Sequence, residues 1–220
     1  MRGVGLNGDK APPTAITFDE TGFKRLGEDD GAQVWGTPEG DELALSHQAR
    51  PPEPGPDLSN LEGLRAFYRR EMRKVGRGVI EIDVVAVDGC DAVRLVFKAV
   101  QQPTGRTYVG GLALALRGVD YLFKVECKER GTIGIRDTFV LNDLLASGEV
   151  RIDSSSNRLI GWLDDPYDWF EEGPMTRNKS ERVEYDARFP DHPLSRARRL
   201  LSHLERTVAI DESMKARPAR

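Results

Sequence analysis

The chain has 220 residues, of which 39% are hydrophobic and 31% are charged. This balance supports a folded core and excludes a protein made of long apolar membrane spans. Lys and Arg number 32 and Asp and Glu number 36, a net charge of −4, so charge alone favours neither nucleic acid nor an anionic membrane as a partner. The length fits a single domain with additional segments.

The N-terminal sequence bears on the expected cellular compartment, and the cysteines and histidines bear on metal binding. The first ten residues, MRGVGLNGDK, lack the apolar run of a secretory signal, so we expect a cytoplasmic protein. Two cysteines are too few for a disulfide scaffold or an all-cysteine zinc site, and the three histidines show no HxH or HExxH spacing. We therefore expect neither a metal nor another cofactor.

The N-terminal quarter predicts short strands between loops. Residues 1–13 are rich in Gly and end in Ala-Pro-Pro, which is typical of a disordered arm. Structure is expected from residue 14, as a hairpin or meander. Turn signals EDDG and PEGD separate its β-like pieces, which cover 15–18, 23–26, 32–36 and 42–49. Four prolines within 51–56 then predict a loop.

The middle of the chain carries the strongest patterns. Ser59 and Glu62 have capping-box spacing, which predicts a helix from residue 59 to about residue 75. Two alternating runs flank Asp88-Gly89, a tight-hairpin signal, and two more continue the meander. The four runs are 79–87, 92–100, 106–116 and 121–128. In the last run apolar and charged residues alternate, which predicts one buried face and one exposed face, with Cys127 in the core.

The C-terminal part mixes irregular and helical patterns. Segment 130–140 predicts a loop leading into a short strand or a turn of helix, and 141–149 a short helix that ends at Ser147-Gly148. Periodicity is lost over 153–190, yet aromatic residues recur, which predicts an irregular excursion held to the body by its aromatics. A last helix follows Asp191 as N-cap, and 213–220 predicts a frayed basic tail. Its apolar stripe is Leu194, Ala197, Leu201, Leu204 and Val208.

This order predicts an α+β fold for residues 14–212. It is a two-layer sandwich in which an antiparallel β-meander with an N-terminal hairpin carries two main helices on one face.

The predicted hairpin, the helix from Ser59, the meander from Val79 to Lys128 and the segment RGTIGIR at 130–136 resemble the PsbP/DcrB-like superfamily. That superfamily includes photosystem-associated subunits, a eukaryotic Ran-release factor and bacterial effector chaperones. The resemblance covers about residues 14–145 and the last helix, and the stretch YDARFPDHPLSR at 185–196 is similar to the ends of bacterial proteins of like layout. Because members mostly act as binding subunits, the resemblance implies a binding role.

Two clusters and one histidine are candidate sites. His192, beside Pro193 at a helix start, is either a base with a lowered pKa or a structural residue that fills a gap next to the Asp191 cap, and we favour the second. The acidic-aromatic run 162–172 is explained most simply by aromatics on the sheet and acids in water, yet Trp and Tyr also favour interfaces. The arginines of the last helix predict a solvated face that pairs with the acidic run, or a site for a phosphate or an acidic partner. They are Arg196, Arg198 and Arg199, with Arg188 and Arg206.

The sequence therefore predicts a non-enzymatic protein-binding domain, an adaptor, chaperone or accessory subunit whose contact surface is segment 153–190 with the adjoining helix. The predicted binding residues are Trp162, Tyr167, Asp168, Trp169, Tyr185, His192 and Arg198. The alternatives are a small hydrolase that uses His192 with Asp168 or Asp186, and a small-ligand protein with a pocket of about 300 Å³ or more on the sheet.

Overall fold

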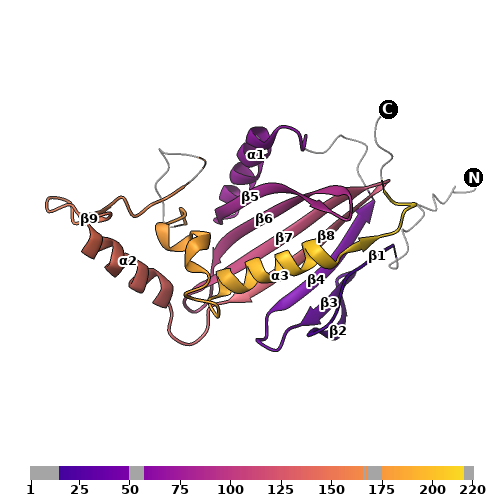
Figure 1. Ribbon diagram of the computed structural model, residues 1–220, viewed down its shortest axis with the longest axis horizontal. Helices are drawn as coiled ribbons and strands as arrows, with labels where there is room; N and C mark the ends of the chain where they lie inside the picture. Colours follow the sequence, from indigo (N-terminus) through magenta and orange to yellow (C-terminus); the bar gives the residue numbers. More distant parts are fainter. Residues whose placement is uncertain (1–14, 50–56, 166, 168–174, 216–220) are drawn as a thin grey trace, which may run out of the picture.

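A computed structural model describes residues 15–49, 57–165, 167 and 175–215. Its centre is a seven-stranded antiparallel sheet in the order β2-β3-β4-β8-β7-β6-β5 (Figure 1). The strands are β2 Lys24–Asp29, β3 Ala32–Gly36, β4 Glu42–Ala49, β5 Gly78–Val87, β6 Cys90–Val100, β7 Arg106–Leu116 and β8 Val119–Lys128. The predicted α+β fold with an antiparallel meander is confirmed.

Helices and short strands surround this sheet. The helices are α1 Leu61–Lys74, α2 Ile135–Ser147 and α3 Pro193–Thr207, with 3-10 turns η1 Lys179–Glu181 and η2 Val183–Tyr185. Two small ladders pair β1 Ile16–Thr17 with β11 Ala209–Ile210, and β9 Arg151–Ile152 with β10 Leu159–Ile160. The predicted disordered arm, the proline-rich loop, Asp168, Trp169 and the end of the predicted tail lie outside the described residues.

The hairpin between β5 and β6 forms at the predicted turn. Asp88 and Gly89 both have positive φ, 47° and 78°, as a two-residue hairpin loop requires. The β8 side chains Tyr121, Phe123 and Val125 are buried at 0 to 2% exposure, so the predicted core face of that strand is confirmed. Cys127 is buried with them, as predicted.

The prediction that the two main helices share one face of the sheet is wrong. Ala92 and Val96 of β6 join the core under α3, whereas Val93, Leu95 and Phe97 of the same strand join a second core under α1. The helices therefore lie on opposite faces. The reason is that β5 and β6 carry apolar side chains on both faces, and each face needs its own cover.

The helix starts differ from the predicted ones. Asn60, not Ser59, caps α1, because its side-chain oxygen accepts the Gly63 N–H at 2.9 Å while Ser59 bonds to Asp57. His192, not Asp191, caps α3, and its Nδ1 accepts the Leu194 N–H at 3.3 Å. The helix α2 begins at Ile135, six residues before the predicted start at 141, and ends as predicted before Gly148.

The close approach of α3 to the sheet depends on a residue without a side chain. A Cβ built on Gly110 of β7 would lie 2.6 Å from a Val125 methyl and 2.8 Å from a Leu201 methyl, whereas one on the neighbouring Gly111 meets nothing nearer than 3.7 Å. Gly110 therefore lets Leu201 of α3 rest directly on the strand.

We expect Gly110→Ala to lower the free energy of unfolding by about 1–3 kcal/mol, because the added methyl overpacks the core. Gly111→Ala is the matched control and is expected to be neutral or slightly stabilising, since it removes backbone freedom from the unfolded chain without a clash. Urea denaturation of both variants measures the difference. Equal stability of the two would contradict the packing argument.

Candidate functional site

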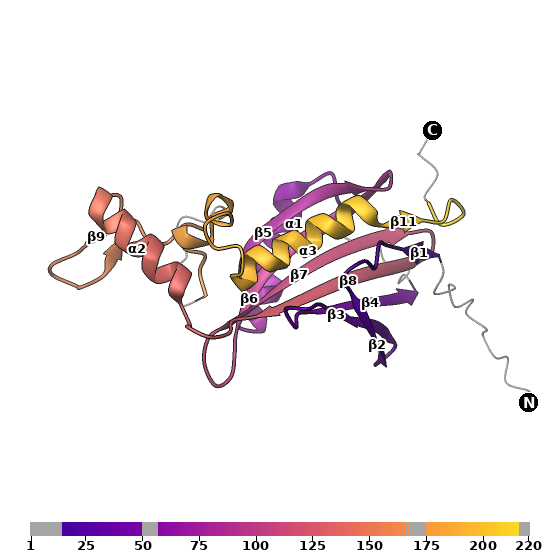
Figure 2. The same cartoon turned by 60° about the horizontal axis from the view of Figure 1, so that its bottom comes forward.

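One end of the molecule is a small unit that projects beyond the sheet (Figures 1 and 2). We call the described residues from 133 to 189, which form α2, β9, β10, η1 and η2, the α2 unit. It has its own core of Val140, Leu144 and Val150, against which the partly buried Leu141, Leu145, Leu159, Trp162, Tyr185 and Phe189 pack. The predicted aromatic anchoring of segment 153–190 is thus largely internal to this unit.

A buried ion pair joins the α2 unit to the sheet. Lys98 of β6 and Glu181 of η1 are both fully buried, with Lys98 Nζ 2.6 and 2.8 Å from the two carboxylate oxygens. The Tyr108 hydroxyl donates to the same carboxylate at 2.9 Å, and burial raises the pKa of that hydroxyl. Burial also lowers the pKa of Lys98, and Glu181 opposes that change. Removing either charge would leave the other buried without a partner.

Arg136 of α2 extends this contact to the start of α3. Its fully buried guanidinium donates to the carbonyl oxygens of Ser180 and Arg182, and at 2.8 Å to Asp186 and to the Ser195 hydroxyl. One side chain thus binds α2, η1, the turn after η2 and α3 together.

The predicted solvated arginine face of α3 is wrong for two of its members. Arg198 is buried and binds Asp186 at 2.9 Å and Glu81 of β5 at 3.1 Å. Arg196 is buried and makes a two-point ion pair with Asp41 at 2.7 and 2.9 Å. Both face the sheet because α3 lies flat on it, and their partners are not in the acidic run.

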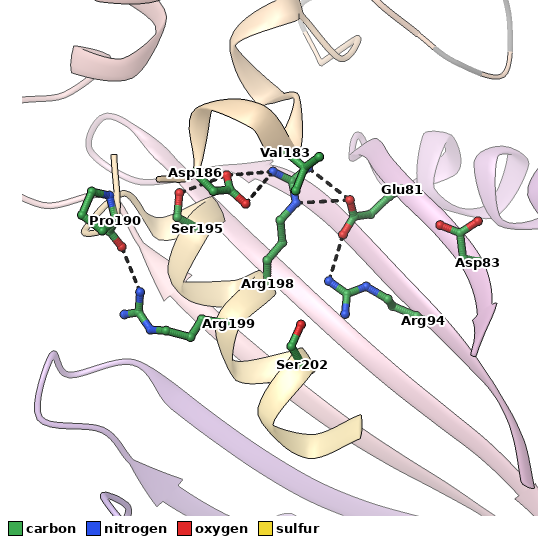
Figure 3. Close-up of a pocket in the computed structure, with 10 residues that line it drawn as sticks. All are labelled: Glu81, Asp83, Arg94, Val183, Asp186, Pro190, Ser195, Arg198, Arg199 and Ser202. Carbon is green, nitrogen blue, oxygen red and sulfur yellow. Dashed lines mark hydrogen bonds and ion pairs between the residues drawn. The ribbon is translucent and has the colours of Figure 1, made fainter. Parts of the chain in front are cut away.

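A groove of about 490 Å³ lies between α3, η2 and β5. Figure 3 shows Arg198 between Asp186 and Glu81, with Arg94 on the far oxygen of Glu81. The lining residues are Glu81, Asp83, Arg94, Val183, Asp186, Pro190, Ser195, Arg198, Arg199 and Ser202. The volume meets the size of the predicted small-ligand alternative, but only Glu81, Asp83 and Arg94 of the lining belong to the meander, whereas a pocket lined by the meander was expected. Its buried charges already bind one another, so a ligand has to compete with these ion pairs.

The contacts of His192 are those of a residue with a structural role. It is buried beside the Tyr108 ring, edge-on at 5.3 Å between ring centroids, and it caps α3. Burial, aided by the Arg136 charge, lowers the pKa of His192 to about 3, so the imidazole is neutral at physiological pH. The Asp186 carboxylate of the predicted hydrolase pair is held by Arg136, Arg198 and Ser195 instead. These contacts favour the structural interpretation of His192, although His192 and not Asp191 is the cap.

Exposed apolar side chains gather on the α2 unit. Among the described residues, seven of the twelve exposed large hydrophobic side chains belong to it. Phe139 is 50% exposed, one turn from Ile135 on the same face of α2. The seven are Ile133, Ile135, Phe139, Ile152, Ile160, Leu163 and Val183. The α2 members were not among the predicted binding residues, because segment 130–140 was expected to be a loop leading into a short strand or a turn of helix, although the spacing of Ile135 and Phe139 is helical.

The other predicted binding residues lie in different places. Trp162 and Tyr185 pack on the core of the α2 unit, while the side chain of Tyr167 reaches away from that core to the edge of β5, where its hydroxyl accepts the Ile82 N–H at 2.9 Å. Within the described ranges, no three His, Cys, Asp or Glu side chains group in a way that would hold a metal ion. No helix there has the length and apolar character to cross a membrane.

No family model matches the chain, and a search of the curated proteins finds no match. Among solved structures it is similar to the Ran-binding protein Mog1p of Saccharomyces cerevisiae, at 13% identity and a TM-score of 0.46, with 97% of each chain covered. A Pseudomonas aeruginosa protein, PA94, described as a putative regulator, matches at 9% identity and a TM-score of 0.32, over 66% of this chain and 87% of its own. The PsbP protein CyanoP of Synechocystis sp. PCC 6803 matches at 14% identity and 0.32, over 66% and 95%. These likenesses concern the α+β arrangement alone.

We expect Glu181→Gln to lower the free energy of unfolding by about 3–5 kcal/mol, because Lys98 loses its carboxylate while staying buried. Adding Lys98→Met is expected to restore part of the loss, since no unpaired charge remains. Glu184→Gln is the matched control: its side chain is 58% exposed, so a change under about 0.5 kcal/mol is expected. Urea denaturation tests all three, and a double variant no more stable than Glu181→Gln would contradict the pairing.

A pH dependence follows from His192. Its pKa of about 3 in the folded state lies below the ordinary 6.5, so the unfolded chain binds more protons between these values. The contribution of the neutral, buried His192 to the free energy of unfolding is complete above about pH 6.5. It falls toward pH 3, by at most about 1.4 kcal/mol per pH unit. His192→Asn keeps a capping side chain and is expected to flatten this slope between pH 6.5 and about 5, above the range where most carboxylates titrate. Denaturation at several pH values measures it, and an unchanged slope would contradict the assignment.

Proposed function

We propose that this protein is a non-enzymatic protein-binding domain, an adaptor, chaperone or accessory subunit, and that its contact surface lies on the α2 unit around the exposed Ile135 and Phe139. The observation that carries the proposal is the concentration of seven exposed large hydrophobic side chains on this one unit. Such groups on a soluble protein mark interaction sites when they gather instead of being scattered.

The support beneath this surface also favours binding. The α2 unit is held by the buried Lys98–Glu181 pair and by Arg136, so its exposed side chains are carried on a fixed frame. A preorganised surface loses little conformational entropy when a partner docks. The aromatic ring of Phe139, with Phe189 at 6.5 Å between centroids, provides the kind of anchor that dominates interface energetics.

The chemistry of the polar groups favours binding over catalysis. The imidazole of His192 is buried and engaged at the helix start, and the carboxylate of Asp186 is bound by two arginines. A general base must reach the proton that it removes, and these two groups face protein partners instead. A cytoplasmic location is also part of the proposal.

The proposal is tested by affinity purification of the tagged protein from its native cells after mild cross-linking, read by mass spectrometry. The informative variant is Ile135→Ser with Phe139→Ser, which removes apolar surface without touching the buried Arg136. We expect a specific partner in the wild-type sample and at least a tenfold lower recovery with the variant, because truncated hot spots commonly cost 2 kcal/mol or more.

The matched control is Leu26→Ser with Val75→Ser, which removes two side chains of 59% and 61% exposure outside the α2 unit. It is expected to retain the partner. Equal recovery with both variants would place the contact surface elsewhere, and a wild-type sample that holds only background proteins would contradict the binding role.

A further inference from the structure

Side chains hydrogen-bond the outward main-chain groups of the edge strand β5 over part of its length. The Ile82 N–H, which points away from β6, donates to the Tyr167 hydroxyl at 2.9 Å, and the Ile82 carbonyl accepts Arg65 Nε at 3.1 Å. The Ile80 carbonyl accepts a guanidinium N–H of Arg177 at 3.2 Å. These side chains occupy the positions in which a neighbouring strand would supply main-chain groups.

No described residue covers the rest of this edge. In an antiparallel ladder the main-chain groups of every second residue point away from the partner strand, so Val84 and Ala86 point outward as Ile82 does. Within the described part of the chain, no residue bonds these outward groups. Ala86 is exposed and Val84 partly so, which leaves a short stretch of strand free to accept another.

The segment with Asp165 and Tyr167, which lies against β5 near Ile82, shows which side chains bind at this edge. Asp165 forms an ion pair with Arg69 of α1 at 2.8 Å, and both side chains are largely buried. The Tyr167 ring lies under the Arg65 guanidinium, 4.6 Å from its centroid. Two arginines of α1 and one amide of β5 thus recognise an acidic residue and a tyrosine two positions apart.

We propose that the β5 edge with Arg65 and Arg69 is a docking site for an extended partner segment that carries an acidic residue and a tyrosine two positions apart, and that Asp165 and Tyr167 occupy this site in cis. The partner segment adds as a strand to β5. It replaces both side chains and also pairs with Val84 and Ala86, which the cis residues leave unbonded.

The groove of Figure 3 supports strand addition. Glu81 and Asp83 of β5 line it, so it borders the same strand on the α3 side. Side chains of an added strand alternate between the faces of the sheet, and those on the α3 side would enter this groove. In such binding the main chain supplies affinity and flanking pockets supply specificity.

The cis residues set the strength of binding. Because they belong to the same chain, their effective concentration at the site is on the order of millimolar, and a partner must compete with it. Removing Asp165 and Tyr167 is therefore expected to strengthen the binding of a peptide in trans. A purely structural role of the two residues predicts no such gain.

The test uses a fluorescein-labelled peptide with the sequence of residues 161–170, GWLDDPYDWF, and fluorescence anisotropy. We expect it to bind full-length Asp165→Ala/Tyr167→Ala protein at least about tenfold more tightly than wild type, and Arg69→Ala in that background to remove the gain. A peptide with Ala at the positions of Asp165 and Tyr167 is the control. Equal affinity for wild type and the double variant, or binding of the control peptide, would overturn the proposal.

A second measurement does not depend on the double variant's folding. Hydrogen exchange followed by NMR on Tyr167→Phe, which loses only the hydroxyl, is expected to show faster exchange at the Ile82 amide, and added peptide to slow exchange at Val84 and Ala86. Unchanged exchange at Val84 and Ala86 under saturating peptide would overturn strand addition. Because Ile135 and Phe139 lie elsewhere, their Ser variants are expected to bind the peptide unchanged, so this proposal and the proposed function fail separately.

Discussion

The position of the α2 unit depends on one buried ion pair, between Lys98 of the sheet and Glu181 of η1. Lys98, near the end of β6 on the α3 side, has no access to water, and burying its charge is costly unless a carboxylate pairs with it. Glu181 does so while also accepting the Tyr108 hydroxyl and the Asn178 N–H. Since these bonds form together in only one placement of η1, they also determine where α2 lies and where α3 begins.

A β-bulge in β5 connects this polar network to the edge of the sheet. The register of β5 against β6 shifts between Val79 and Glu81, so Ile80 and Glu81 both serve the α3 side. Glu81 then receives Arg94 and Arg198, and Arg198 continues to Asp186. A regular strand would turn the Glu81 side chain toward α1, and Arg198 would lose one of its two acids. The bulge therefore helps to form both the groove and the start of α3.

The sequence correctly predicts the turns and strands that depend on interactions between neighbouring residues. Asp88-Gly89 and the alternation in β8 locate the meander, because turn geometry and a two-residue period are local properties. The environment of Arg198 is different: its partner Glu81 lies 117 positions away, and that of Arg196, Asp41, lies 155 away. An arginine is assigned to solvent unless such a partner is known. The prediction that the two main helices share one face was wrong for a related reason. Apolar residues on both sides of β6 do not show which helix covers which face.

The candidate surfaces differ in what a partner must overcome. Phe139 and its neighbours are already exposed on a unit held by buried charges, so docking there requires no rearrangement. At β5 the outward groups of Ile82 are bound, and a partner strand has to displace Asp165 and Tyr167 first. Observed affinity at such a site is reduced by the fraction of molecules in which it is open. Tyr167, predicted from sequence as a binding residue for its aromatic character alone, therefore decides how often the edge is available.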